Sequence, residues 1–370
     1  MPTPAPNRLN EFSGAFADLG TFLPLVLGLI ALNGFSAERI FLGFGLFAIA
    51  IACYYRRPIP VQPMKVIAAM TIGLGLSPAV MEASTLMIGL ILILLALSGA
   101  ITALARQLSQ AVSVGLQLAI GLQLMKMGLE QISLNWVAGL GALGLLLMFR
   151  GNKASIVMLL IIAGGILWQS LGTNTGQLPR QSWQMTLPSL SEWQFAAFSL
   201  VLPQLALTLT NAVIATSAMA SDKFPEDKAR LTPKHLGLSS GLANLLSAPF
   251  GGIAMCHGAG GLAAQYSFGA RTALAPAIFG VSCLIFATGW QYGLGDLLLL
   301  LPLPILGALL TLAGGQLAWS KRFLDGRPFC LVVIGATAIT ALMVNMAAGL
   351  ALGLILEWGR KRAITRPESL

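Results

Sequence analysis

Long apolar runs separated by short polar interruptions make up almost the whole chain. About fourteen such runs can be counted, and several approach the roughly 20 residues that a helix needs to cross the hydrocarbon core of a bilayer. We expect the first seven at 12–33, 36–54, 60–76, 80–104, 107–127, 131–149 and 152–171. The second seven are expected at 194–220, 232–249, 253–267, 270–290, 295–318, 328–343 and 345–361. The pattern predicts an all-α integral membrane protein with about 14 transmembrane segments.

A polar stretch at 173–192 divides these segments into seven and seven. Because each half crosses the membrane an odd number of times, the second half enters from the opposite side. That is the geometry of an inverted repeat, which is common among secondary transporters. We therefore expect a first inverted repeat at 1–175 and a second at 190–370.

The composition agrees with a membrane protein and excludes an ordinary soluble domain. Of the 370 residues, 56% are hydrophobic and 9% are charged, against about 25% charged residues in soluble domains. The four cysteines are scattered without the spacing of a metal site, so we expect neither disulfides nor a metal centre. The polar, proline-rich start MPTPAPNRLNEF has no apolar core of a cleaved signal.

The net charge of +9 is best explained by membrane topology and not by nucleic-acid binding. Fourteen crossings place both termini on one side, together with 18 of the 22 basic residues. These are Arg8, Arg56, Arg57, Arg106, Arg150, Lys153, Lys223, Lys228, Arg230, Lys234, Arg271, Lys321, Arg322, Arg327, Arg360, Lys361, Arg362 and Arg366. Arg39 and Arg180 fall on the opposite side, Lys126 near a helix end and Lys65 within a segment. We therefore predict a multi-pass protein of a bacterial inner (plasma) membrane with both termini in the cytoplasm.

Two short segments at matching places in the two halves carry helix breakers. The first reads PIPVQPMKVIAAM (58–70) and the second APFGGIAMCHGAGG (248–261). The prolines keep 58–63 extended, so a helix is expected to start at about Met64; the second helix is expected to start near Cys256 or His257. Extended backbone at membrane depth is tolerated where it lines a cavity, and the following helix N-termini offer free N–H groups and a positive dipole end. Together with the charge of Lys65, this predicts a site for a small anion between the two half-helices.

The candidate substrate-binding residues come from these segments and from the first segment of the second half. They are Gln62, Met64, Lys65, Val66, Gln204, Thr208, Asn211, Cys256, His257 and Gly258. Other interpretations stay open: Lys65 extending to the interface, His257 capping the turn, and the amides of Gln62, Gln204 and Asn211 joining helices.

Asp18 is a second charge at membrane depth, and such a charge is expected to be functional and to have a partner. Lys65 is the predicted partner. Because a carboxylate in contact with an anion would repel it, we expect Asp18, with Thr21 one turn away, to act in coupling or gating, for example by carrying a proton.

Four stretches, GAFADLGTFLPLVLGL (14–29), PIPVQPMKVIAA (58–69), LPQLALTLTNAVIATSAMASDKFPE (202–226) and GGIAMCHGAGGLAAQYSFGART (251–272), resemble the signature stretches of the molybdate transporter family, which is related to the SulP-type sulfate permeases. The resemblance implies the uracil-transporter fold, in which segments 3 and 10 are each a short strand plus a half-helix. It implies core helices at 12–104 and 194–290, gate helices at 107–171 and 295–361, no STAS domain, and a homodimer through the gate domains.

The resemblance implies a secondary active transporter of molybdate, and also of tungstate, working by an elevator-like movement of core against gate. A sulfate permease is the main alternative, because both ions are tetrahedral dianions. A nucleobase permease fits less well, because Glu192 is the acid nearest to the segments that hold the base in those relatives. A passive anion channel stays a further alternative. The chain shows no GxxxxGK[ST] motif and no nucleophile–base arrangement, so we expect neither an ATP motor nor an enzyme, and no cofactor.

Overall fold

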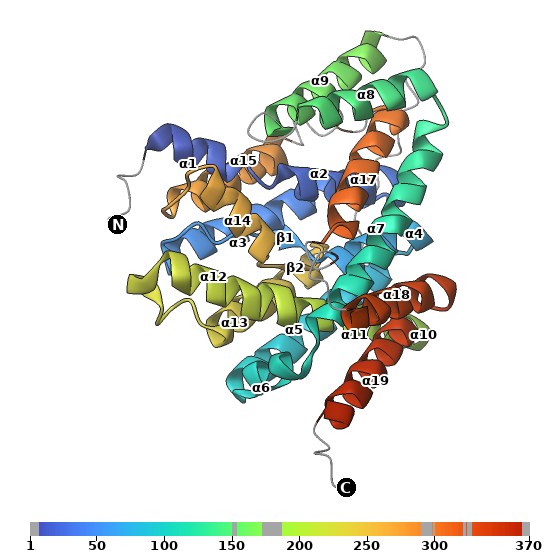
Figure 1. Ribbon diagram of the computed structural model, residues 1–370. Coiled ribbons are helices and arrows are strands. Elements are labelled where there is room, and N and C mark those ends of the chain that lie inside the picture. Colours follow the sequence, from blue (N-terminus) through green and yellow to red (C-terminus); the bar gives the residue numbers. More distant parts are fainter. Residues whose placement is uncertain are drawn as a thin grey trace, which may run out of the picture.

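The computed structural model describes residues 7–149, 154–171, 187–289, 298, 300–320, 323 and 328–364, and it is mostly helical (Figure 1). The first half contains α1 (Arg8–Ala15), α2 (Leu19–Asn33), α3 (Ala37–Tyr55), β1 (Gln62–Pro63), α4 (Lys65–Leu74), α5 (Pro78–Leu97), α6 (Ala100–Gln107), α7 (Gln110–Ile132), α8 (Trp136–Met148) and α9 (Ala154–Leu171).

The second half begins with one long composite helix, made of α10 (Leu190–Phe195), η2 (Ala196–Val201), α11 (Leu202–Leu207), η3 (Thr208–Ala215) and α12 (Thr216–Lys223). It continues with η4 (Pro225–Asp227), α13 (Pro233–Ser247), η5 (Ala248–Phe250), β2 (Met255–Cys256), α14 (Ala259–Ser267), α15 (Leu274–Gly289), α17 (Leu303–Ala318), α18 (Pro328–Met343) and α19 (Met346–Ile364).

The helices follow the predicted apolar runs, with two differences. The first run is broken at 16–18 into α1 and α2, and the fourth ends in a separate short helix, α6. Within the described residues, five helices are long and apolar enough to cross a membrane, and six shorter ones are apolar. Most of the polar stretch 173–192 and part of the run 295–318 lie outside the described residues, as do seven of the basic residues used to predict the topology. These seven are Arg150, Lys153, Arg180, Lys321, Arg322, Arg327 and Arg366.

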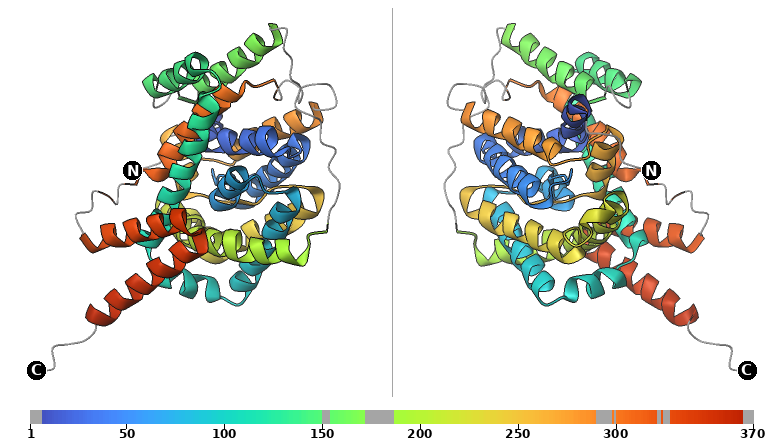
Figure 2. Two further views of the ribbon diagram at one scale, coloured as in Figure 1. Left: turned by 90° about the vertical axis from the view of Figure 1, so that its right-hand side faces the viewer. Right: turned by 90° about the vertical axis from the view of Figure 1, so that its left-hand side faces the viewer.

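The helices pack in two groups, which Figures 1 and 2 show from three sides. The α7/α17 group consists of α7, α8, α9, α17, α18 and α19, with α8–α9 at one end of the α7–α17 pair and α18–α19 at the other. The α3/α15 group consists of α1–α6 and α10–α15, with the short elements between them. The two groups meet where α2 packs on α17 and where α4 packs on α7.

Helix pairing inside the α3/α15 group follows the symmetry of an inverted repeat. The helix α3 packs on α15, and α5 packs on α13. In each pair the second segment of one half lies against the fourth segment of the other half. The α7–α17 pair, the most extensive in the described chain, joins the fifth segments of the two halves.

Reciprocal glycines allow these pairs to approach closely. A Cβ added at Gly121 would lie 2.5 Å from the carbonyl oxygen of Gly314, and one at Gly314 would lie 2.5 Å from that of Gly121. The same reciprocity holds for Gly128 with Gly307, a second pair at the α7–α17 crossing, for Gly45 with Gly280 and for Gly89 with Gly241. Small residues are the usual means of close helix packing in membranes, where no hydrophobic driving force separates lipid from protein.

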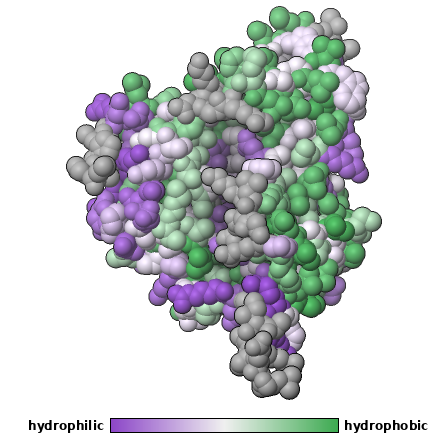
Figure 3. Space-filling model, viewed as in Figure 1, coloured by the Kyte–Doolittle hydropathy of each residue, from purple (hydrophilic) through white to green (hydrophobic). Residues whose placement is uncertain are grey.

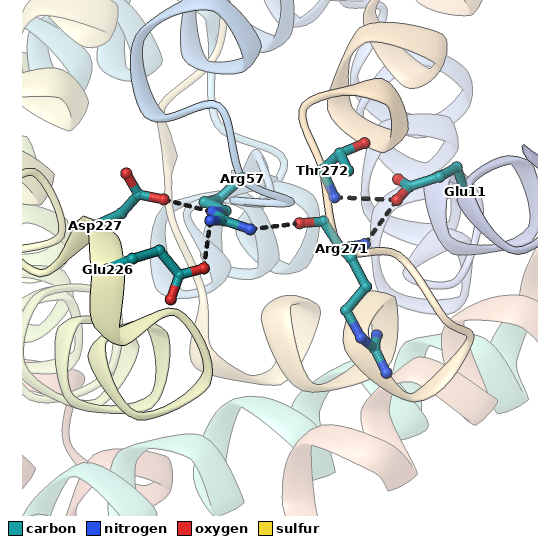
Figure 4. A network of polar contacts seen from close by, with 6 residues as sticks. All are labelled: Glu11, Arg57, Glu226, Asp227, Arg271 and Thr272. Atoms are coloured by element: carbon teal, nitrogen blue, oxygen red, sulfur yellow. Dashed lines mark hydrogen bonds and ion pairs between the residues drawn. The ribbon is translucent and has the colours of Figure 1, made fainter. Parts of the chain in front are cut away.

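A polar network joins four segments of the α3/α15 group at one end, as Figure 4 shows. The guanidinium of Arg57, which follows α3, donates to Asp227 Oδ2 at 2.6 Å, to Glu226 Oε1 at 2.5 Å and to the carbonyl oxygen of Arg271 at 3.3 Å. The Arg57 side chain is 20% exposed, so solvent screens these contacts only in part.

The second half of the network is centred on Glu11 of α1, which is 1% exposed. Its Oε1 accepts from the backbone N–H groups of Arg271 at 2.8 Å and Thr272 at 3.0 Å, while the Arg271 side chain points away from it (Figure 4). That guanidinium instead lies 3.6 Å above the centre of the Tyr266 ring. The network therefore ties α1, the end of α3, η4 and the end of α14 together, close to the segments that form the site described below.

The surface has the polarity of a membrane protein. Figure 3 shows hydrophobic residues over α7, α17 and α18, and hydrophilic residues along the opposite margin near α1 and α12. Large apolar side chains that are exposed on the α7/α17 group include Leu122, Leu129, Leu145, Leu342 and Met343. An apolar face of this kind is stable against lipid.

Candidate functional site

The two broken segments meet in a short antiparallel sheet. Strand β1 pairs with β2 in the register Gln62 to Cys256 and Pro63 to Met255. The N–H of Met64 then donates to the carbonyl oxygen of Ala254 at 2.8 Å. This pairing satisfies backbone groups of the extended stretches at membrane depth and brings the beginnings of α4 and α14 close together.

The helix starts differ in how well the sequence predicts them. Helix α4 begins at Lys65 with Met64 as its N-cap, one residue from the prediction. The prediction that the second helix starts near Cys256 or His257 was wrong, because α14 begins at Ala259. The physical reason is that Cys256 pairs in the sheet and the ring of His257 is hydrogen-bonded to the Pro60 carbonyl oxygen at 2.9 Å, which hold this stretch extended.

The two helix N-termini are not equivalent. The side-chain oxygen of Gln204 accepts from the N–H of Val66 at 2.8 Å and from that of Ile67 at 3.4 Å, so it caps α4 from the neighbouring α11. The Gln204 amide group donates onward to Thr208 Oγ1 at 2.9 Å. Gln204, a candidate for binding substrate or for joining helices, therefore joins α11 to α4 in this structure.

Among the described residues, no side chain caps helix α14. Its first intrahelical bond runs from the N–H of Leu262 to the carbonyl oxygen of Gly258, so three N–H groups precede it. They belong to Ala259, Gly260 and Gly261. A Cβ added at Gly260 would meet nothing within 4 Å, which shows that this helix start faces open space.

That space is a cavity of about 330 Å³ between the two helix groups. One wall belongs to the α3/α15 group and includes Asp18, Gly20, Thr21, Gln62, Lys65 and Gly260. The other wall belongs to the α7/α17 group and consists of Leu146, Ser155, Met158, Leu312 and Gln316. At about 30 Å³ per molecule, the cavity has room for roughly ten waters, and so for a small ion with part of its hydration shell.

Lys65 places a positive charge in this cavity. The side chain is half-buried in the first turn of α4. In the part of the chain that the structure describes, no carboxylate oxygen lies within 4 Å of its ammonium group. The Asp18 carboxylate interacts with this ammonium group electrostatically from beyond that distance, so the cavity holds a positive group beside the start of α14 and a carboxylate on the same wall.

Asp18 shares the cavity, but its hydrogen bonds go to other partners than the predicted Lys65. One carboxylate oxygen accepts from the Thr21 hydroxyl at 2.6 Å, and the other accepts from the side-chain amide of Gln62. Gln62 is 2% exposed and lies against Gly258 and Gly261 of the α14 start, where a Cβ would collide with its amide. The Asp18–Gln62 contact thus joins the break between α1 and α2 to both broken segments.

His257 is fully buried and does not line the cavity. Because the Pro60 carbonyl oxygen can only accept, the Nδ1 atom of His257 carries a proton and donates to it over 2.9 Å. The Nε2 atom lies 2.8 Å from the Ser239 hydroxyl, which lies 2.9 Å from the Tyr55 hydroxyl. The imidazole therefore braces strand β1, in line with the interpretation as a residue that caps the turn.

The sequence analysis missed Asn244 of α13, which is fully buried. Its side-chain oxygen accepts from the N–H of Met255, and its amide group donates to the carbonyl oxygen of the same residue, both at 2.8 Å. The Asn244 side chain thus satisfies the backbone groups of Met255 that a third strand would otherwise bond at the free edge of β2. An asparagine within the apolar run 232–249 was the available signal.

The other predicted binding residues lie around the site without lining the cavity. Met64 and Val66 are fully buried behind the α4 start, Thr208 is 1% exposed beneath Gln204, and Cys256 is paired in β2. Asn211 lies further along η3, a stretch of wider helix of the kind that often marks functional sites. A direct contact of these residues with substrate stays a prediction.

Comparisons with known proteins agree with this geometry. Residues 10–124 and 196–317 match the model of the family described as "Molybdate transporter of MFS superfamily". Similar curated proteins include Molybdate transporter 2 of Arabidopsis thaliana, 26% identical over 409 residues that cover 94% of this chain and 86% of the relative. Molybdate transporter 1 of Chlamydomonas reinhardtii is 27% identical, with 94% of this chain and 90% of the relative covered.

Solved structures with the same fold are transporters as well. The transmembrane domain of a cyanobacterium bicarbonate transporter, BicA, superposes with a TM-score of 0.66 at 16% identity, covering 92% of this chain and 96% of that domain. Murine Solute Carrier 26 family member A9, an anion transporter in the inward-facing state, gives a TM-score of 0.70 at 14% identity, covering 97% of this chain and 69% of that one. At these identities the likeness concerns the fold, which is that of the uracil-transporter-like membrane proteins.

Proposed function

The chain belongs to the molybdate transporter family, and from this premise we propose that it is a secondary active transporter of a tetrahedral oxyanion, molybdate foremost and tungstate with it. The observation that carries the proposal is the Lys65 ammonium, which forms no ion pair within 4 Å among the described residues and shares a cavity of about 330 Å³ with the start of α14. The ion would be held between the two half-helices, by one full charge and by N–H donors at a positive dipole end.

In this proposal the α3/α15 group is the core that carries the ion and the α7/α17 group is the gate. The core would comprise 12–104 and 194–290, and the gate 107–171 and 295–361. Transport would follow an elevator-like movement of one against the other. Two features support this division: the polar network of Figure 4 ties α1 and the end of α14 to the end of α3 and to η4, all within the α3/α15 group, and the cavity lies where the two groups meet.

Only a few hydrogen bonds cross between the two groups in the described chain, so the boundary can slide. Ser113 of α7 and Thr210 of η3 are joined at 2.8 Å, and the Ser155 hydroxyl of α9 donates to the Phe16 carbonyl oxygen at 2.9 Å. Each hydrogen bond contributes only about 1 kcal/mol to stability, so it can break and be replaced by a bond to another partner.

Asp18 is assigned to coupling or gating in this account. It lies on the same wall as Lys65, and its two carboxylate oxygens already accept from Thr21 and Gln62, so neither oxygen is assigned to bind the anion. A proton on Asp18 would weaken its hydrogen bond with the Gln62 amide and loosen the contact between the two broken segments, which would link proton binding to movement.

The proposal places the chain in the inner membrane of a bacterium with both termini in the cytoplasm, because most basic residues then face the cytoplasm. A homodimer through the α7/α17 group would cover part of its exposed apolar face.

Uptake into proteoliposomes tests the transport activity. A secondary transporter gives saturable molybdate uptake that is accelerated by unlabelled molybdate on the other side. A passive channel would give uptake without such counterflow and would overturn the proposed mechanism. Preference for sulfate over molybdate would keep the site and change the substrate to that of a sulfate permease.

A further inference from the structure

The wall of the cavity contributed by the α7/α17 group is mostly apolar. Leu146, Met158 and Leu312 offer no hydrogen bond. The Ser155 hydroxyl is already used, because it donates to the Phe16 carbonyl oxygen at 2.9 Å. Gln316 is therefore the residue on this wall, within the described chain, whose side chain is free to bind a polar ligand.

Gln316 lies near the end of α17 and is exposed to the cavity. Its amide faces Gly20 of α2: a Cβ added there would lie 3.7 Å from the amide oxygen and 3.9 Å from the amide nitrogen. Gly20 directly precedes Thr21, which donates to Asp18, so the amide lies close to the polar wall of the cavity. Among the described residues the Gln316 side chain has no hydrogen-bond partner.

We infer that Gln316 is a specificity-determining residue that donates from α17 to the oxyanion held by Lys65 and the start of α14. This inference rests on the proposed function and extends it to the opposite wall. An amide offers two N–H donors without a charge. It can therefore donate to oxygens of a tetraoxo anion that receive no hydrogen bond from the core side.

The contact has a consequence for the transport cycle. Lys65 and α14 would move with the ion, whereas Gln316 belongs to the group against which they move. A hydrogen bond between Gln316 and the ion is therefore made in the present arrangement and lost in the other. An interaction that differs between two states shifts their populations, so Gln316 favours the arrangement seen here when the ion is bound.

The test compares three variants of the full-length purified protein in calorimetric titrations with molybdate and sulfate. Gln316→Met keeps the volume and removes both donors, and Gln316→Glu replaces them with an acidic group. Gln131→Ala, on α7 and away from the cavity, is the matched control. We expect roughly tenfold weaker molybdate binding for Gln316→Met, as one hydrogen bond to a charged ligand predicts, and a larger loss for Gln316→Glu.

The thermal midpoint of both Gln316 variants and the affinity of Gln131→Ala should match the wild type, which separates ligand contact from a structural role. Wild-type affinity in Gln316→Met and Gln316→Glu would overturn the inference and leave the proposed function standing. If the wild type itself binds neither anion, the proposed function fails and the inference fails with it. A change in the molybdate-to-sulfate ratio in Gln316→Met, with unchanged folding, would support the specificity role directly.

Discussion

Replacing Gly314 with alanine tests the packing of α17 on α7. The new Cβ would lie 2.5 Å from the Gly121 carbonyl oxygen and 2.8 Å from both N and Cγ of Met125. Because ordinary contacts begin near 3.4 Å, the helices must part by up to about 0.9 Å at this crossing. Overpacking of this kind costs about 1–3 kcal/mol.

The neighbouring Gly315 provides the control. A Cβ there would come no closer than 4.0 Å to Met125 Sδ. Both substitutions gain the same helix propensity, up to about 1 kcal/mol, so the difference between them isolates the clash. Thermal unfolding of the purified variants, followed by circular dichroism, should give a midpoint about 1–4 °C lower for Gly314→Ala than for Gly315→Ala. Equal midpoints would refute the close crossing of Gly121 and Gly314.

Three further predictions concern the polar groups of the site and its support. Asp18→Asn should reduce molybdate uptake far more than molybdate binding, and an equal loss of both would count against a coupling or gating role. Arg57→Ala should lower the free energy of unfolding by about 1–3 kcal/mol, because its charged hydrogen bonds are lost, whereas Arg230→Ala at an exposed position should change it little. Thermal unfolding compares the two variants, and equal effects would contradict a stabilising role of the polar network in Figure 4. Asn244→Leu should weaken anion binding as well as stability, because the backbone of Met255 loses both side-chain partners; normal binding would show that β2 holds its place without them.

The breaks in the two central segments could be predicted because proline and glycine act locally. Three prolines within 58–63 prevent a helix wherever the segment lies, and α4 accordingly begins at Lys65. The start of α14 at Ala259 could not be predicted in the same way. It depends on the pairing of Cys256 with Gln62, which lies nearly 200 residues away in the chain. The local sequence pattern around Cys256 does not predict that pairing.

The roles of individual polar residues were less predictable than their presence near the site. Gln204 was a candidate because it is polar and follows a proline, but whether its amide donates to an ion or accepts from α4 depends on which helix it faces. The sequence did not distinguish Gln316 or Ser155, because each is one of a few polar residues in an otherwise apolar helix. Only the packing of α9 and α17 against the α3/α15 group places Ser155 and Gln316 at the cavity.

The most direct test of the central claim is a calorimetric titration of the wild type and of Lys65→Ala with molybdate, tungstate, sulfate and uracil. Lys126→Ala is the matched control, because that side chain is 79% exposed on α7, outside the cavity. The account predicts that the wild type and Lys126→Ala bind molybdate and tungstate more tightly than sulfate. It predicts that Lys65→Ala stays folded and binds molybdate at least about tenfold more weakly, because an ionic contact in the cavity is lost. Unchanged molybdate affinity in Lys65→Ala, or binding of uracil alone by the wild type, would contradict an anion site between the two half-helices.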